Sequence, residues 1–193
     1  DLTFELQEKI APILGFSSGT KGIEEMMRQY HLSTQKILNF ATGVSDRILS
    51  EPPPLRKVLI FFKRGKIDPF FRISHGEIHL LDPVTFKREP SQLMTLFNHC
   101  QNYRIEMDYQ TEEAVVEALP FIDDRFRTSE LVNQTFLWIL RKGDGVEAIL
   151  KKMHELGLLS RYIPEFSEIE GKVHYDLYHV HPVDIHLILA VEE

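Results

Sequence analysis

Apolar residues recur every three to four positions along most of this chain, with polar residues between them. This spacing matches the 3.6-residue period of an amphipathic α-helix. Glycines and prolines interrupt the pattern and mark the expected helix ends, because neither residue readily continues a helix. The pattern predicts helices over residues 1–14, 23–49, 90–103, 111–126, 130–141, 146–156 and 182–191.

One segment near the middle of the chain departs from the helical spacing. Phe70–Ile73 and Glu77–Leu81 are short runs with apolar and aromatic residues, and Ser74-His75-Gly76 separates them. Two such runs around a glycine-containing turn predict a β-hairpin. We therefore expect a mainly α fold, a helical bundle with a small inserted β-hairpin.

Some side chains inside these elements have a predictable environment. Met26 and Met27 lie on an apolar helix face and are expected to fill core space. Cys100 lies in an apolar helical pattern, so we expect a buried, inert thiol. We place His75 in the hairpin turn and His79 on an exposed strand face.

Polar residues at the helix ends indicate where helices begin. Thr111 opens an acid-rich first turn of the predicted helix 111–126, and Thr128 or Ser129 is expected to cap the next helix. Asp123 and Asp124 are adjacent on helix 111–126 and would point to two faces. We interpret them as a solvated edge and not as a metal-binding pair.

Composition limits the classes of protein to which the chain can belong. Its 193 residues are 43% hydrophobic and 26% charged, which is typical of a soluble globular protein. The net charge of −7 argues against a sequence-independent nucleic-acid binder. No apolar run approaches the roughly 20 residues of a membrane span. We expect neither nucleic acid nor membrane as a partner, and the single cysteine favours a reducing, cytoplasmic location.

Histidines are concentrated near the end of the chain. Aspartates Asp176 and Asp184 are interleaved with four of the nine histidines, which are His174, His179, His181 and His186. Imidazole and carboxylate together are suitable ligands for a divalent metal. The alternative is that single histidines beside apolar residues pack in the core or cap a helix, and that the clustering arises by chance.

Residues 156–186, LGLLSRYIPEFSEIEGKVHYDLYHVHPVDIH, form the most specific motif of the chain. The motif closely resembles a segment of the bifunctional uridylyltransferase/uridylyl-removing enzymes, which act on the nitrogen-signalling protein PII. Weaker similarities precede it in the family's order, in Phe4–Phe16, Glu24–Tyr30 and Asp82–Phe97. The resemblance thus spans essentially the whole chain.

This resemblance implies a multidomain enzyme. Members have a nucleotidyltransferase domain that transfers UMP from UTP to PII, a helical region, and a metal-dependent HD phosphohydrolase domain that removes the UMP. Glutamine favours removal, and Mg²⁺ or Mn²⁺ is the implied cofactor. By the resemblance, residues 1–160 are the helical linker that follows a missing nucleotidyltransferase domain, and residues 161–193 are the truncated start of the HD domain.

The resemblance assigns few site residues to this chain. His186 matches the first metal ligand of an HD site, and His179 and Asp184 are weaker candidates. A later His-Asp dyad is missing from the sequence, as are the Gly-Ser turn and paired aspartates of a nucleotidyltransferase. We therefore expect a fragment without a complete active site, inactive alone and with no tightly bound metal. Ile185 and Leu187 replace the family's glutamate and threonine, which would fit a member with lost or altered removal activity.

Two other functional hypotheses remain open from the sequence. In the first, the chain is a helical interaction or regulatory module of a diverged nucleotidyltransferase-like signalling protein that does not act on PII. In the second, it is a self-contained metal protein that uses His174, His179, His181 and His186. The open end of a helix would give the second kind of site a poorly ordered ligand set.

Overall fold

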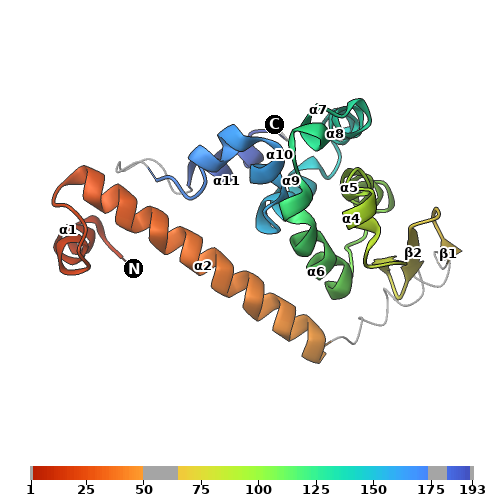
Figure 1. The fold of residues 1–193 in the computed structure, drawn as a ribbon. Helices are drawn as coiled ribbons and strands as arrows, with labels where there is room; N and C mark the ends of the chain where they lie inside the picture. Colours follow the sequence, from red (N-terminus) through yellow and green to blue (C-terminus); the bar gives the residue numbers. More distant parts are fainter. Residues whose placement is uncertain (1, 50–64, 174–181, 192–193) are drawn as a thin grey trace.

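The computed structural model describes residues 2–49, 65–173 and 182–191. The described chain is mainly α-helical, with one small antiparallel sheet, which confirms the predicted fold class. Figure 1 shows two parts: a pair of N-terminal helices, and a packed body that contains the sheet and the remaining helices. Within the described ranges, no helix combines the length and the hydropathy that crossing a bilayer requires.

The N-terminal pair consists of α1 (Phe4–Ile13) and the thirty-residue α2 (Thr20–Leu49). The pair confirms both predicted helices, although α2 begins three residues earlier than expected. The two helices pack through a small buried cluster formed by Ala11, Ile23, Met26 and Met27. The core position predicted for the two methionines is therefore confirmed.

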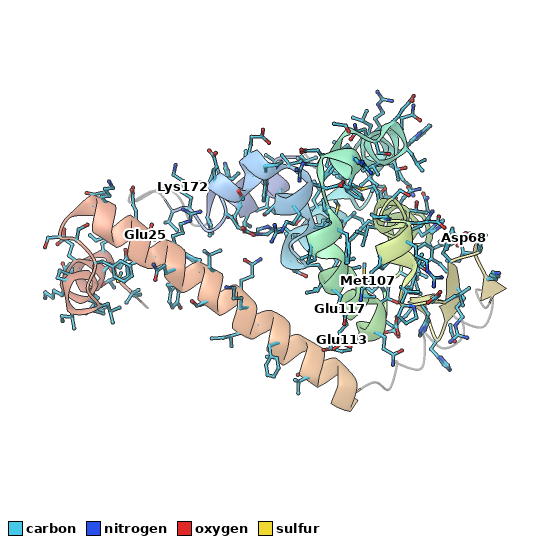
Figure 2. All side chains as sticks on the ribbon, viewed as in Figure 1. Glu25, Asp68, Met107, Glu113, Glu117 and Lys172 are labelled. Atoms are coloured by element: carbon cyan, nitrogen blue, oxygen red, sulfur yellow. The ribbon has the colours of Figure 1, made fainter. Side chains whose placement is uncertain are left out.

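Helix α2 extends well past the cluster that joins it to α1. At 1.5 Å per residue its length is about 45 Å. Its second half exposes apolar side chains: Ile37 is 66% and Phe40 74% accessible. In Figure 2, side chains of this half project from the helix, whereas those of the body lie crowded between packed elements.

The sheet is a three-stranded antiparallel meander of β1 (Gly65–Lys66), β2 (Phe71–Ser74) and β3 (Glu77–Leu80). The predicted hairpin corresponds to β2 and β3, and β1 was not predicted. His75 and Gly76 form the turn, and both have positive φ, 53° and 87°, as a two-residue type I′ hairpin loop requires. The placement of His75 in the turn is thus confirmed.

The body continues as a series of mostly short helices. Three of them, α4, α10 and the 3₁₀-helix η3, lie outside every predicted helix. The order along the chain is α4 (Thr85–Arg88), α5 (Gln92–Tyr103), α6 (Tyr109–Ala118), η2 (Leu119–Phe121), α7 (Asp124–Thr128), α8 (Glu130–Lys142), α9 (Val146–Glu155), α10 (Leu158–Tyr162), η3 (Pro164–Glu168) and α11 (Val183–Leu189).

The prediction of one continuous helix over residues 111–126 is wrong. Helix α6 begins earlier, because Asp108 caps it by accepting a hydrogen bond from the Thr111 N–H at 3.2 Å. The 3₁₀ turn η2, which contains Pro120, follows, since proline cannot continue the α-helical hydrogen-bond pattern. Asp123 then caps a separate helix, α7, through the Phe126 N–H at 3.0 Å. The next cap is Ser129, one of the two predicted residues.

One continuous hydrophobic core holds the body together. It includes the buried faces of β2 and β3 and residues from α4 through α10, and it extends to Ile188 in α11. Cys100 lies within this core, and burial raises the pKa of its thiol to about 12. The expected burial of the thiol is confirmed, and its inertness stays a prediction. The predicted boundary between domains at residue 160 stays a prediction.

Candidate functional site

The predicted site residues fall into two groups. His174, His179 and His181 lie outside the described residues, as does Asp176. The other two candidates, Asp184 and His186, both lie in the short helix α11, which begins directly after Pro182 as the sequence predicted.

Asp184 and His186 have different environments. Asp184 is only 2% accessible, whereas the His186 side chain is exposed. Residues two positions apart on a helix point in different directions, so the structure does not bring these two side chains together. The question is then what holds a carboxylate so deeply inside the protein.

The Asp184 carboxylate is surrounded by protein donors. Its Oδ2 atom accepts a hydrogen bond from the Gly171 N–H at 2.8 Å, and Oδ1 accepts one from the Ile185 N–H at 2.9 Å. The Nε2 atom of His154 lies 3.1 Å from Oδ2. Burial raises the pKa of Asp184, but the nearby His154 imidazole and the two backbone N–H groups outweigh it, so the pKa is lowered overall.

His154 reaches this carboxylate from α9, where it occupies the helix face that also carries Met153 and Leu150. Its imidazole is buried, and Nδ1 lies 3.7 Å from the Glu170 Oε1 atom. The ring packs edge-on against Phe166, with centroids 5.5 Å apart. The imidazole therefore lies between the carboxylates of Asp184 and Glu170.

Helix α2 contacts the same loop from its other side. The Arg28 guanidinium donates to the Glu170 carbonyl oxygen at 3.0 Å and to the Ser167 carbonyl oxygen at 3.3 Å. Gly171 lies so close to α2 that an added Cβ would come within 3.0 Å of Leu32 Cγ. Its φ of +65° is also a conformation that favours glycine.

The pKa of His31, on α2, is also affected by burial and by Asp184. Burial lowers its pKa, and the negative charge of Asp184 partly offsets that effect. We refer to the five residues that join α2, α9 and α11 as the Asp184 clamp: Arg28, His154, Glu170, Gly171 and Asp184. In Figure 1, α9 and α11 lie on the same side of α2.

The described residues do not assemble a metal site. A divalent cation needs several ligands that converge on one point. In the described part of the chain, no group of three or more His, Cys, Asp or Glu residues does so. Both oxygens of Asp184 already accept hydrogen bonds from the protein, which accounts for this carboxylate without a metal. The metal roles of His186, His179 and Asp184 stay predictions.

Two further contacts between histidine and aspartate were missed by sequence reasoning. His99 Nε2 lies 2.7 Å from Asp68 Oδ2, and this contact joins α5 to the turn before β2. His79 Nδ1 lies 3.1 Å from Asp108 Oδ2, and this contact joins β3 to the cap of α6. His79 lies on the strand face opposite the core, with the exposed Arg72 and Glu77, as predicted, but its own side chain is partly buried because of this contact.

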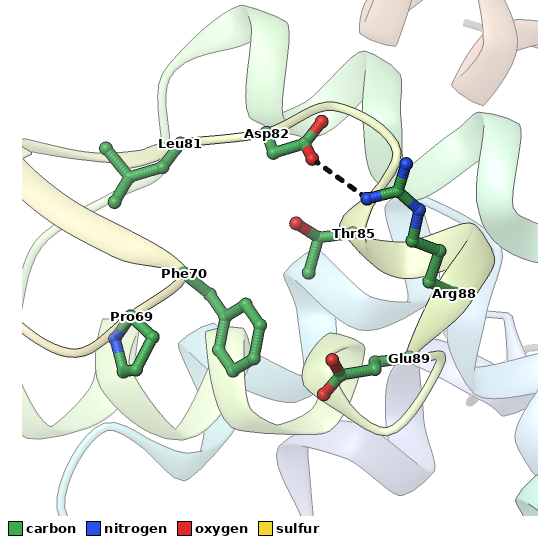
Figure 3. Close-up of a pocket in the computed structure, with 7 residues that line it drawn as sticks. All are labelled: Pro69, Phe70, Leu81, Asp82, Thr85, Arg88 and Glu89. Carbon is green, nitrogen blue, oxygen red and sulfur yellow. Dashed lines mark ion pairs between the residues drawn. The ribbon is translucent and has the colours of Figure 1, made fainter.

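A small pocket lies between the sheet and α4, far along the chain from the clamp. It has a volume of about 210 Å³ and is lined by Pro69, Phe70, Leu81, Asp82, Thr85, Arg88 and Glu89. Figure 3 shows the ion pair between Asp82 and Arg88 at its rim, with an N–O distance of 3.5 Å. The pocket is smaller than typical ligand sites, which occupy roughly 300–1,000 Å³, so we assign it no function.

A segment of the body is similar in sequence to a known family of domains. Residues 71–162 match the family described as uridylyltransferase GlnD third domain. These residues begin at β2 and end with α10, so the matched segment covers most of the large hydrophobic core. No solved structure matches the chain.

Curated relatives are similar to nearly the whole chain. The bifunctional uridylyltransferase/uridylyl-removing enzyme of Azospirillum brasilense is 29% identical over 98% of this chain. The enzymes of the same name from Ruegeria pomeroyi and Bradyrhizobium sp. are 28% and 29% identical, again over 98% of the chain. These comparisons confirm the resemblance expected from the sequence. The chain spans about a fifth of the length of these relatives, 21% of the first.

Proposed function

We propose that this chain is the helical region of a uridylyltransferase/uridylyl-removing enzyme that acts on PII. The observation that carries the proposal is the match of residues 71–162 to the GlnD third domain, within a similarity that covers 98% of the chain. The complete enzyme transfers UMP from UTP to PII and hydrolyses it off again. Its partners are PII, UTP and glutamine, it uses Mg²⁺ or Mn²⁺, and it works in the cytoplasm.

The role of this region is to hold two catalytic units in register. A single core supports the body, and the Asp184 clamp connects that body to the long helix α2. A framework that fixes geometry can contribute to catalysis without touching the reacting atoms, because misplaced groups lose much of their rate advantage. Such a region is inactive by itself.

Two aspartates of the body support the proposal that this region is structural and that catalysis occurs in other domains. Asp123 caps α7, and Asp124 pairs with Arg127 at 2.6 Å. Both carboxylates thus serve the local structure, in place of the paired metal ligands that nucleotide transfer requires. The transfer chemistry belongs to a domain upstream of the region, and removal belongs to an HD domain whose first helix is α11.

The test uses the complete gene product together with a PII protein and UTP labelled at the α-phosphate. We expect label to appear on PII and to be released when glutamine is added. The 193-residue chain alone is the control and is expected to transfer none. If the gene product is folded and PII remains unlabelled, the proposal is contradicted.

A second function is favoured by one observation, the exposed apolar surface on the distal half of α2. Ile37, Leu38 and Phe40 are all largely accessible there, and exposed apolar patches often mark interaction sites. The chain would then be an interaction or regulatory module of a diverged signalling protein that does not act on PII. A pull-down with modified and unmodified PII separates the two functions, because this module binds neither form.

A further inference from the structure

The Asp184 carboxylate connects segments that are far apart in the chain. It accepts a hydrogen bond from Gly171, thirteen positions earlier, and lies beside His154 on α9. A second backbone bond, from the Val183 N–H to the Lys172 carbonyl oxygen at 2.9 Å, holds the start of α11 against the same loop. The position of α11 is therefore set by the loop and by α9.

Asp184 and His154 are both buried, so water cannot readily replace the contacts that they make. Asp184 is 2% accessible and the His154 side chain is equally buried. A charged carboxylate is costly to bury unless hydrogen bonds and an opposite charge compensate it. The interactions around Asp184 provide that compensation, so loss of any of them is expected to loosen α11.

Helix α2 fixes the loop from the opposite side. Arg28 donates to the Glu170 carbonyl oxygen in the loop and to the Ser167 carbonyl oxygen in η3, and Gly171 allows the loop backbone to lie directly against Leu32. A displacement of α2 would therefore break the Arg28 hydrogen bonds or move the segment that carries Glu170 and Gly171. The loop in turn carries the N–H that binds Asp184.

We propose that Asp184 is a positioning residue and not a metal ligand, and that it transmits the position of α2 to α11 and thus to His186. The importance of His186 in this statement rests on the proposed function. The mechanical link between the two helices does not, since it is defined by contacts within this chain. A metal site would need several ligands that converge on one point together with Asp184, and the described part of the chain contains no such group of three or more His, Cys, Asp or Glu residues.

Hydrogen exchange of the 193-residue chain tests the link directly. In Asp184→Asn, the Gly171 and Val183 amides should exchange at least about tenfold faster, while amides of α5 keep their protection. Asp184→Ala should show the same pattern more strongly. Unchanged exchange at Gly171 in both variants would overturn the proposal.

Variants on α2 test whether the link reaches α11. Arg28→Ala should speed exchange at the His186 and Ala190 amides, which donate to Pro182 and His186 within α11. Lys36→Ala, an exposed change on the same helix, is the matched control and should leave these amides as they are. If Arg28→Ala also leaves them unchanged, α2 does not control α11.

Mn²⁺ alone tests the alternative that Asp184 binds metal. Paramagnetic broadening of the Gly171 and Ile185 amide signals that disappears in Asp184→Asn would overturn the proposal. No broadening, or broadening that survives Asp184→Asn, supports it. None of these measurements involves UTP or PII, so a failure of the proposed function leaves their outcome interpretable.

Discussion

The body and the N-terminal helix pair differ in the means by which each is held together. The body has a continuous core that draws on nearly all of its elements. Among the residues described for the pair, the fully buried cluster is small and consists of Ala11, Ile23, Met26 and Met27. The pair therefore depends more on its contacts with the loop at Gly171. The difference indicates that the core of the body supplies most of the stability. The junction, by which we mean the Asp184 clamp, determines how α2 is placed against the body.

Thiol labelling should give the largest contrast between the two regions. The pKa of Cys100 is raised by burial to about 12, so at pH 9 we expect iodoacetamide to react at least about a thousandfold more slowly than in urea. A cysteine introduced by Met27→Cys should react at least tenfold faster than Cys100, because the small cluster opens more easily. Equal rates would show that the regions are equally stable.

Because the pKa of Cys100 is raised, the free energy of unfolding of the body should fall as the pH becomes alkaline. The pKa of the thiol in the unfolded chain is about 8.5, well below the pKa of about 12 in the folded protein. The unfolded state therefore releases its proton first, so the Cys100 contribution falls as pH rises from about 8.5 toward 12. Urea unfolding across this interval should show a larger loss in wild type than in Cys100→Ala, because other groups such as Tyr162 titrate in both proteins.

Truncation of a core side chain should cost more unfolding free energy in the body than in the N-terminal pair. Phe97 is fully buried in the body, so Phe97→Ala should cost about 3–5 kcal/mol of unfolding free energy. Met27→Ala should cost about 2 kcal/mol, because its smaller cluster can relax around the missing side chain. Urea denaturation followed by circular dichroism measures both. A larger loss for Met27→Ala would reverse the comparison.

Two glycines with similar backbone angles isolate the effect of the junction. Gly171 has φ +65° and Leu32 beside it, whereas Gly145 has φ +73° and no atom within 4 Å of an added Cβ. Gly145→Ala should cost about 1 kcal/mol from backbone strain alone. Gly171→Ala should cost about 2–3 kcal/mol, since it adds a steric clash with α2. Equal losses would mean that the contact with α2 is loose.

The smallest effect is expected at a surface ion pair of the body. Lys87 Nζ lies 3.1 Å from Glu117 Oε2, and both side chains are exposed. Solvent and salt screen such pairs, so Lys87→Ala should change the unfolding free energy by no more than about 0.5 kcal/mol. A loss comparable with that of Gly171→Ala would indicate that surface charge, and not packing, organises this region.

Local patterns in the sequence predicted much of the fold. Helical spacing located α1, α2, α5, α8 and α9, and the glycine turn located the β2–β3 hairpin. The errors occurred where a local signal was overlooked or a distant partner decided the structure. Pro120 signalled the break after α6, although its neighbours kept the helical spacing. The partial burial of His79 depends on Asp108, which lies on another element.

The junction was harder to predict than the fold. The sequence pattern indicates Asp184 only as a candidate ligand beside the histidines, and no predicted site includes His154. A histidine on the apolar face of a predicted helix signals a buried polar group that needs a partner. The sequence does not show which aspartate provides it, because the partner lies thirty positions away and is brought near only by the loop at Gly171.

A double-mutant cycle between Arg28 on α2 and Asp184 on α11 tests the central claim most directly, that one junction connects the two regions. The side chains reach the same loop from opposite sides, so the loss from Arg28→Ala should remove part of what Asp184→Asn would otherwise cost. We predict that the double variant loses at least about 0.5 kcal/mol less than the sum of the single variants. Losses that add within that margin would contradict the claim and leave α2 and α11 as independent elements.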